Sequence, residues 1–254
     1  MTGYMRLRQI CLVAPHLEPV VGDLAAIFGL EVCYRDPHVG KYGLENALLP
    51  VDTTLLEVVA PFQDGTAAGR FLQRTGNRGG YMAIFACDDP DERGRHAATL
   101  GVRTANVIDH PPYHGVQLHP RDCRAAFIEF NHTAGSDNIR GPYPPAGPDW
   151  QASIRTDVTQ ALLGVELQSP DPAGLARHWS AIIGAPVSAV DRGDPEIVLV
   201  NGRLRFVTGT EELMIGVTMQ VHDVSAVLSA AKAKGHAIDG NSFLLGGVAF
   251  RLTS

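Results

Sequence analysis

The chain has 254 residues, of which 45% are hydrophobic and 19% charged, so it can bury a substantial core in one large or two ordinary domains. Its net charge of -6 and the lack of a basic stripe exclude general nucleic-acid binding. No signal-peptide pattern opens the chain and no apolar run is long enough for a membrane helix. The four cysteines show neither zinc spacing nor a disulfide pattern, so we expect a cytoplasmic protein with reduced thiols.

Four stretches of the chain share one pattern: a short apolar strand, then Asp, Pro or His where a helix can begin, then a helix-like segment and a glycine. The stretches are "RQICLVAPHL", "GYMAIFACDD", "GVELQSPDPA" and "GVTMQVHDVS", and the glycines are Gly29, Gly101, Gly184 and Gly235. A glycine just past a helix is the usual left-handed cap. Short alternating segments follow each glycine and are typical of strands. The sequence therefore predicts four copies of a βαβββ unit.

Two glutamates stand in apolar strands at matching places of the first two units. Glu57 lies in "TTLLEVVAP", 48 residues after Gln9, and Glu129 lies in "RAAFIEFNH", 48 residues after Tyr81. A buried glutamate is costly unless it is paired, hydrogen-bonded or bound to a metal. One such acid could simply end a strand at the rim, but the recurrence favours a site. The last two units carry Gly164, Gly216, Arg205 and Arg251 at the matching places, so we expect no metal there.

A segment rich in Gly and Pro separates the two halves of the chain. It reads "HTAGSDNIRGPYPPAGPDW", and its composition is typical of a linker. We therefore predict one domain over 5–132 with the candidate site, a linker over 133–150, and a second domain over 151–254 with a degenerate site. Trp150 could anchor the linker.

The paired βαβββ pattern resembles the vicinal oxygen chelate superfamily, which includes glyoxalase I, methylmalonyl-CoA epimerase, extradiol dioxygenases and bleomycin-resistance proteins. The resemblance rests on "QICL" and "YMAI" at the strand starts and on the two embedded glutamates. It implies an α+β fold in which four units form two half-open barrels. It also implies metal ligands at Gln9, Glu57 and Glu129, whereas Tyr81 stands where related epimerases have a histidine.

The implied ligands would form an all-oxygen set. Mg²⁺, Mn²⁺ or Fe²⁺ would tolerate such a set better than Zn²⁺, which favours nitrogen and sulfur. The metal would hold two neighbouring substrate oxygens, and Glu57 or Glu129 would move a proton as the catalytic residue. The alternative is a pocket that keeps its acidic residues without a metal.

Five further residues are candidates for substrate binding. Tyr81 takes the ligand place of the second unit, and His119 in "VQLHPRDC" could replace the missing imidazole or lie in a turn. Tyr42 and Asn46, in and after a Gly-rich loop, could bind substrate or serve as turn and strand residues. Arg70, in an expected helix, could bind an anionic group or remain solvated.

The resemblance implies a metal-dependent lyase or isomerase of the glyoxalase or epimerase kind that acts on a small carbonyl or hydroxy-acid compound. The alternative is a non-catalytic binder that sequesters a small molecule, as bleomycin-resistance proteins do. An extradiol dioxygenase is a weaker alternative, because the two-histidine set of those enzymes is absent at the matching places. We expect a small-molecule partner, no nucleic acid or membrane partner, and a homodimer by analogy with related folds.

Overall fold

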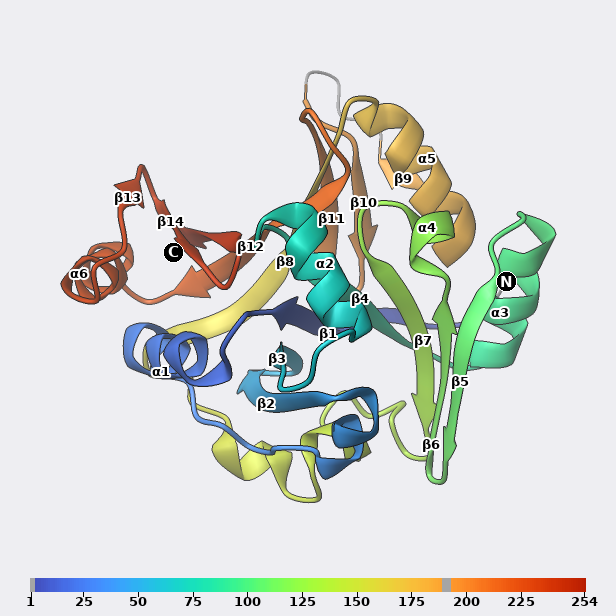
Figure 1. The fold of residues 1–254 in the computed structure, drawn as a ribbon, viewed down its shortest axis with the longest axis horizontal. Helices are drawn as coiled ribbons and strands as arrows, with labels where there is room; N and C mark the ends of the chain where they lie inside the picture. Colours follow the sequence, from blue (N-terminus) through green and yellow to red (C-terminus); the bar gives the residue numbers. More distant parts are fainter. Residues whose placement is uncertain (1–2, 189–192) are drawn as a thin grey trace. The chain divides into compact units, whose positions relative to one another are not determined.

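The computed structural model describes residues 3–188 and 193–254, and a strand-and-helix repeat recurs four times along the chain (Figure 1). The first repeat comprises β1 (Met5–Val13), α1 (Leu17–Phe28), the 3-10 helix η1 (Pro37–Tyr42), β2 (Leu44–Val51) and β3 (Thr54–Pro61), and α2 (Ala67–Thr75) follows it. The second comprises β4 (Gly80–Cys87), α3 (Pro90–Thr99), β5 (Thr104–His110), β6 (Tyr113–Leu118), α4 (Pro120–Cys123) and β7 (Phe127–Thr133).

The second half of the chain continues the same order. Two 3-10 helices, η2 (Pro144–Ala146) and η3 (Trp150–Ser153), come first. The third repeat comprises β8 (Thr159–Ser169), α5 (Pro172–Ile183), β9 (Val187–Ser188), β10 (Glu196–Leu199) and β11 (Gly202–Thr208). The fourth comprises β12 (Leu213–Val221), α6 (Val224–Ala233), β13 (Ile238–Asp239), β14 (Ser242–Leu245) and β15 (Val248–Thr253). The predicted α+β fold of four repeats is confirmed, although the first repeat has the single bridge Tyr34↔Leu48 where the others have an extra strand.

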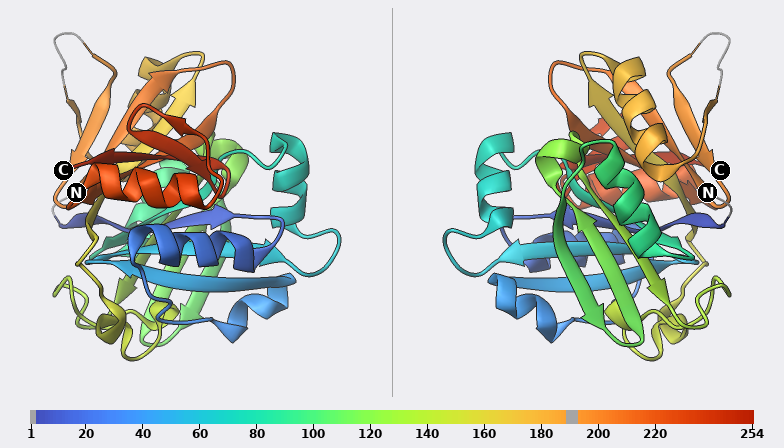
Figure 2. Two further views of the ribbon diagram at one scale, coloured as in Figure 1. Left: turned by 90° about the vertical axis from the view of Figure 1, so that its left-hand side faces the viewer. Right: turned by 90° about the vertical axis from the view of Figure 1, so that its right-hand side faces the viewer.

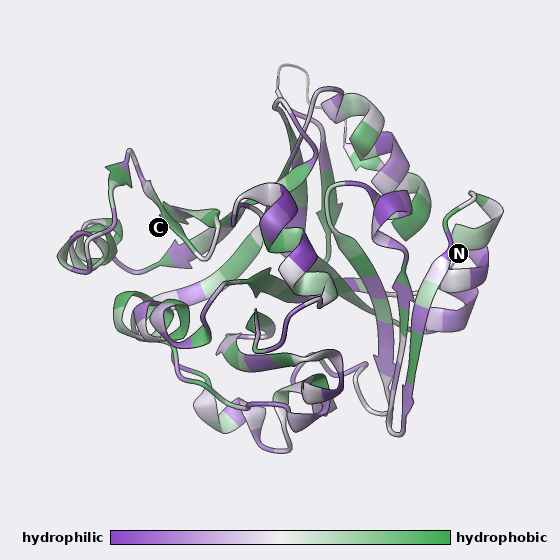
Figure 3. Ribbon diagram, in the orientation of Figure 1, coloured by the Kyte–Doolittle hydropathy of each residue, from purple (hydrophilic) through white to green (hydrophobic). Residues whose placement is uncertain are grey.

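The helices begin and end where local sequence signals place them. Aspartates cap α3, α5 and α6, each accepting a hydrogen bond from the backbone N–H three residues on. Gly29 and Gly184 end α1 and α5 in the left-handed conformation, with φ of 68° and 70°. In α2 the buried residues recur at helical spacing and form one apolar face, which packs on β3 (Figure 3).

Each repeat pairs its first strand with its last strand in parallel. The registers are Cys11↔Glu57, Ile84↔Glu129, Glu166↔Arg205 and Thr218↔Arg251. Arg205 and Arg251 therefore occupy the places that Glu57 and Glu129 hold in the first two repeats, as the sequence predicts. The remaining strands of each repeat add antiparallel hairpins.

By its internal contacts the chain divides into two compact units, and each combines one repeat from either half of the chain. Unit 1 comprises residues 1–8, 81–144 and 164–214, and unit 2 comprises 9–80, 145–163 and 215–254. In unit 1, α3 packs on β6 and β7 and also contacts α5. In unit 2, α1 lies along β2 and β3 and contacts α6, and Phe28 stacks on Phe243 with ring centroids 5.7 Å apart (Figure 2). The domain division over 5–132 and 151–254 stays a prediction.

The connecting segment is packed rather than loose. Arg6 donates to the carbonyl of Ser136 at 2.5 Å, and Arg8 donates to the carbonyl of Ile139 at 3.2 Å, all within unit 1. Trp150 is only 1% exposed, and η3 packs on β2 within unit 2. Trp150 therefore has the buried position expected of an anchor.

Candidate functional site

Glu57 is the centre of a buried polar cluster in unit 2. It lies on β3 with 7% of its surface exposed, so the rim interpretation does not hold. Gln9 on β1 donates through Nε2 to Glu57 Oε2 at 2.8 Å, and Asn46 on β2 donates through Nδ2 to Oε1 at 2.6 Å. The parallel register places Gln9 opposite Leu55, on the face that Glu57 shares. Each carboxylate oxygen thus has an amide donor.

Asn46 holds Glu57 in place and does not reach outward. Its Oδ1 accepts the backbone N–H of Asp36 at 2.8 Å while its Nδ2 serves Glu57. The Asp36 carboxylate in turn accepts the backbone N–H of His38 at 2.9 Å and caps η1. The side-chain amide of Asn46 therefore links the Glu57 carboxylate to Asp36, the N-cap residue of η1. A role of Asn46 in substrate binding stays a prediction.

The environment of Glu57 shifts its protonation. Burial raises the pKa of Glu57, hydrogen bonds from Asn46, Cys11 and Gln9 lower it, and the nearby charge of Asp36 raises it, with burial dominating. The resulting pKa lies above the ordinary value of a glutamate. A carboxyl group with a raised pKa in a buried polar cluster is suited to holding and releasing a proton.

Glu129 is the centre of a second cluster, in unit 1. It lies on β7 and is 2% exposed. The hydroxyl of Tyr113 donates to Glu129 Oε1 in a short hydrogen bond, and Gln117 donates through Nε2 to Oε2 at 2.8 Å. Gln117 Oε1 accepts from Asn106 at 3.1 Å, so its amide orientation is held from behind. The pattern of the first repeat thus recurs: one donor for each carboxylate oxygen.

The sequence interpretation missed Tyr113 and Gln117. Both lie on β6, two positions to either side of Gly115, so they share one face of the strand. The antiparallel register Gln117↔Glu129 then sets them beside the carboxylate. The spacing "YHGVQL" before the Glu129 strand was the available signal, but only the register says which residues meet.

The equivalence of Tyr81 with Gln9 is wrong by one residue. Gln9 pairs with Leu55, which lies two residues before Glu57. In the second repeat Met82 pairs with Phe127, which lies two residues before Glu129. Because side chains alternate along a strand, a shift of one residue moves a side chain to the opposite face. The second repeat is one residue shorter between these strands, so the residue 48 positions before Glu129 is not the equivalent of Gln9. Tyr81 is 7% exposed and its ring lies 4.9 Å from that of Phe127.

The other candidates lie in local structures. Tyr42 is 46% exposed in η1, with the ammonium of Lys41 over its ring. Arg70 is exposed on α2 and donates to the carbonyl of Gly65. His119 caps α4 by accepting the backbone N–H of Arg121 at 3.3 Å, the turn position that was its alternative interpretation. Binding roles for Tyr42, Arg70, His119 and Tyr81 stay predictions, and so does a site shared by the two glutamate clusters.

The donor types can be compared with what a metal requires. Gln9 and Glu57 offer amide and carboxylate oxygens, which suit hard cations such as Mg²⁺ or Mn²⁺. To act as a ligand, Gln9 must turn its amide so that Oε1 replaces Nε2. Within residues 3–188 and 193–254, no group of three or more His, Cys, Asp or Glu side chains is arranged to hold an ion. The fit to a hard cation thus lies in the type of donor that Gln9 and Glu57 offer.

The third repeat carries an ion pair at the corresponding place. Glu166 is 5% exposed and pairs with Arg205 at 3.4 Å, and Arg205 also meets Asp194 at 2.6 Å. The arginine thus places a positive charge beside the buried acid. The degenerate site of the second half stays a prediction.

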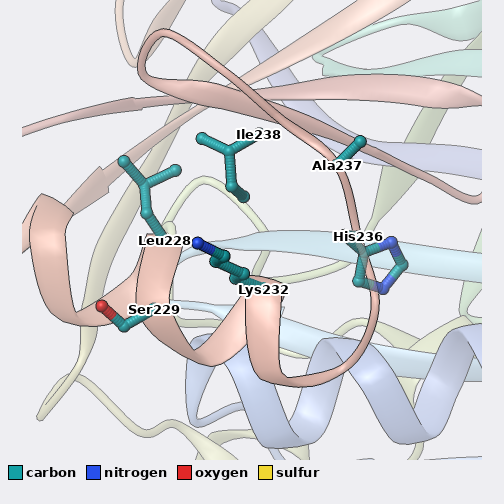
Figure 4. A pocket seen from close by; sticks show the side chains of 6 residues that line it. All are labelled: Leu228, Ser229, Lys232, His236, Ala237 and Ile238. Carbon is teal, nitrogen blue, oxygen red and sulfur yellow. The ribbon is translucent and has the colours of Figure 1, made fainter.

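A surface hollow of about 420 Å³ lies between α6 and β13 in the fourth repeat (Figure 4). Its lining residues are Leu228, Ser229, Lys232, His236, Ala237 and Ile238. None of the predicted site residues lines it, so it belongs to different chemistry or to none.

Among the helices of the described residues, none has both the length and the apolar character needed to cross a membrane.

Comparisons with known proteins reach the same fold. No family model matches the chain. Methylmalonyl-CoA epimerase, mitochondrial, of Dictyostelium discoideum is 24% identical over 135 residues, which cover 50% of this chain and 78% of the epimerase. The Mn(II)-bound glyoxalase of Novosphingobium aromaticivorans superposes with a TM-score of 0.67 at 14% identity, covering 99% of this chain and 82% of the glyoxalase.

Two other solved structures cover nearly the whole chain. A hypothetical protein from Staphylococcus aureus has a TM-score of 0.68 at 13% identity and covers 98% of both chains. A mutant of 4-hydroxymandelate synthase from Streptomyces coelicolor has a TM-score of 0.63 at 12% identity and covers 93% of this chain and 76% of that one. The glyoxalase and the synthase are members of the vicinal oxygen chelate superfamily. The chain therefore has the fold of the vicinal oxygen chelate superfamily, built from four repeats of its strand-and-helix unit.

Proposed function

We propose that the chain is a metal-dependent lyase or isomerase of the glyoxalase or epimerase type that acts on a small carbonyl or hydroxy-acid compound. One observation carries the proposal: Glu57 is a buried carboxyl group with a raised pKa, held at both oxygens by side-chain amides. The similarity to an epimerase and the glyoxalase fold support the reaction type.

The chain's own residues have distinct parts in this chemistry. Gln9 and Glu57 would hold the metal, which when bound would polarise neighbouring substrate oxygens. Glu57 takes a proton from the carbon beside the carbonyl at one of its carboxylate oxygens and returns it. Asn46 keeps the Glu57 carboxylate in position during both transfers through its hydrogen bond to Oε1.

A non-catalytic small-molecule binder is the second candidate. The observation that favours it is the complete pairing of Glu57 and Glu129, whose oxygens all accept hydrogen bonds from protein donors. Such a cluster is satisfied without a cation. A binder would need the pocket but not the proton transfer.

Metal content and proton exchange, measured on one preparation, separate the two candidates. Purified protein is analysed for metal after dialysis against Mn²⁺, and a panel of small 2-oxo and 2-hydroxy acids and methylmalonyl-CoA is incubated in D₂O. The enzyme is expected to bind Mn²⁺ in stoichiometric amount and to exchange a carbon-bound proton of one compound. Glu57→Gln should abolish exchange, whereas Glu166→Gln, which changes a buried acid of the third repeat, should keep both properties. Binding of a compound without metal or exchange would favour the binder.

A further inference from the structure

Strand β7 carries a row of three buried polar side chains on one face. Glu129, Asn131 and Thr133 alternate along the strand, and they are 2%, 1% and 0% exposed. The strand lies between β4 and β6, all within unit 1 (Figure 1). Polar groups are rarely buried in a row unless each finds a hydrogen-bond partner.

The row is only partly satisfied by the protein. Glu129 has a donor at each oxygen, from Tyr113 and Gln117. Asn131 Nδ2 and Thr133 Oγ1 are, for the described residues, the buried side-chain polar atoms that have no hydrogen-bond partner. An unpaired buried donor costs free energy, because the hydrogen bond it made with water in the unfolded chain is lost. Two such atoms at successive positions of one face, next to a candidate catalytic glutamate, point to a group that the protein itself does not supply.

The residues opposite Asn131 on the two neighbouring strands offer its amide no hydrogen-bond partner. The register pairs Asn131 with Ala86 on β4 and with Gly115 on β6, and neither side chain is long enough to reach the amide. A Cβ atom at residue 115 would stand 3.1 Å from the ring of Tyr113 and 3.3 Å from Glu129 Oε1. Because residue 115 has no side chain, it leaves room for the Tyr113 ring and for its hydrogen bond to Glu129.

We infer that Asn131 is a ligand-binding residue whose Nδ2 donates to the carbonyl oxygen of a small molecule held beside Glu129. Thr133 supplies a hydroxyl at the next position of the same face. Residues on one face of a strand lie about 7 Å apart, so the carbonyl would bring its neighbouring carbon toward Glu129. An uncharged carbonyl suits this place better than a carboxylate, because the Glu129 carboxyl group is the next side chain along the strand. The substrate class rests on the proposed function, but the binding role of Asn131 does not.

Solution NMR of the Asn131 side-chain amide tests the inference directly. The probes are methyl pyruvate and pyruvate, an ester and a free acid with the same carbonyl, added to metal-free protein with assigned amide resonances. Methyl pyruvate is expected to shift the Asn131 Nδ2 resonance saturably, and pyruvate to shift it less. No shift with either probe overturns the inference. A larger shift with pyruvate overturns the choice of an uncharged carbonyl.

A matched pair of variants separates binding from structure. Asn131→Leu should raise the Tm, because it removes an unpaired amide, and should weaken methyl pyruvate binding about tenfold. Asn201→Leu is the control, because Asn201 is fully paired: its Nδ2 donates to the Leu7 carbonyl at 2.8 Å and its Oδ1 accepts the Leu7 N–H at 3.0 Å. That control should lower the Tm and leave binding unchanged. A structural role would instead make both variants lose stability and leave the probe affinity alone.

The result also distinguishes this inference from the proposed function. A probe that shifts Asn131 in protein without metal or proton exchange would support the binding site and contradict the enzyme. Metal binding and exchange with an unshifted Asn131 resonance would support the enzyme and overturn the role of Asn131.

Discussion

At the scale of single residues, the two buried glutamates are held by short-range donors from neighbouring strands. Glu57 has Gln9 and Asn46, and Glu129 has Tyr113 and Gln117. Leaving a buried donor without a partner costs about 1–3 kcal/mol. Removing either the carboxylate or one of its donors therefore leaves the remaining group without its hydrogen-bond partner.

Replacing Glu57 by glutamine or by leucine should lower the free energy of unfolding by different amounts, with the larger loss for leucine. In Glu57→Gln the new amide can accept from Asn46 and donate to Gln9, once Gln9 turns its side chain. In Glu57→Leu both donors lose their acceptor, so the free energy of unfolding should fall by about 2–5 kcal/mol. Urea denaturation at pH 7 measures both. Equal losses for the two variants would contradict the hydrogen-bonded cluster.

The same position predicts how stability depends on pH. The pKa of Glu57 is raised on folding, chiefly by burial, so the folded protein binds a proton more tightly than the unfolded chain does. The stability that Glu57 contributes is fully present below the pKa that this residue has in the unfolded chain. It is lost as the pH rises through the higher pKa that Glu57 has in the folded protein. Glu57→Gln should therefore gain stability relative to the wild type as pH rises through this range. Denaturation midpoints from pH 4 upward check the trend, and a constant difference would contradict it.

At the scale of elements, each repeat depends on a parallel pairing of its first and last strands. In the third repeat, Gly164 on β8 has φ of 156°, and a Cβ there would lie 2.0 Å from the carbonyl oxygen of Arg203 on β11. The two strands can approach this closely only because residue 164 has no side chain. In α1, by contrast, Gly22 has open space around its Cβ position.

Substituting these two glycines should have opposite signs. Gly164→Ala forces β8 and β11 apart and should lower the free energy of unfolding by about 3 kcal/mol or more. Gly22→Ala should raise it by about 0.5–1 kcal/mol, because alanine is the better helix former. Thermal and urea denaturation of both variants test this. A neutral Gly164→Ala would show that the two strands are not so closely packed.

At the scale of the whole molecule, the segment between the halves is a structural part of the fold. Trp150 is among the largest fully buried side chains, and it stands at the end of the Gly- and Pro-rich stretch. A loose linker would leave such a ring exposed, at a cost in apolar surface. The packed connector thus ties 145–163 into unit 2.

Truncating this ring should destabilise the protein strongly. Trp150→Ala removes a fully buried aromatic side chain and should cost about 3–5 kcal/mol. Trp150→Phe keeps most of the volume and should cost clearly less. Chemical denaturation followed by far-UV circular dichroism gives both values. A change within about 0.5 kcal/mol for the alanine variant would mean that the segment behaves as a solvated linker.

The sequence by itself determined the features that depend on residues close together in the chain. The four repeats, the aspartate and glycine caps of the helices and the apolar strands around Glu57 and Glu129 follow from local patterns. The tertiary structure alone decided which side chains meet each glutamate. Strand register depends on pairings across long loops, and one residue of shift replaced Tyr81 with Met82 at the place of Gln9. Asn46, Tyr113 and Gln117 reach the glutamates from strands paired beside them, a relation that no local pattern contains.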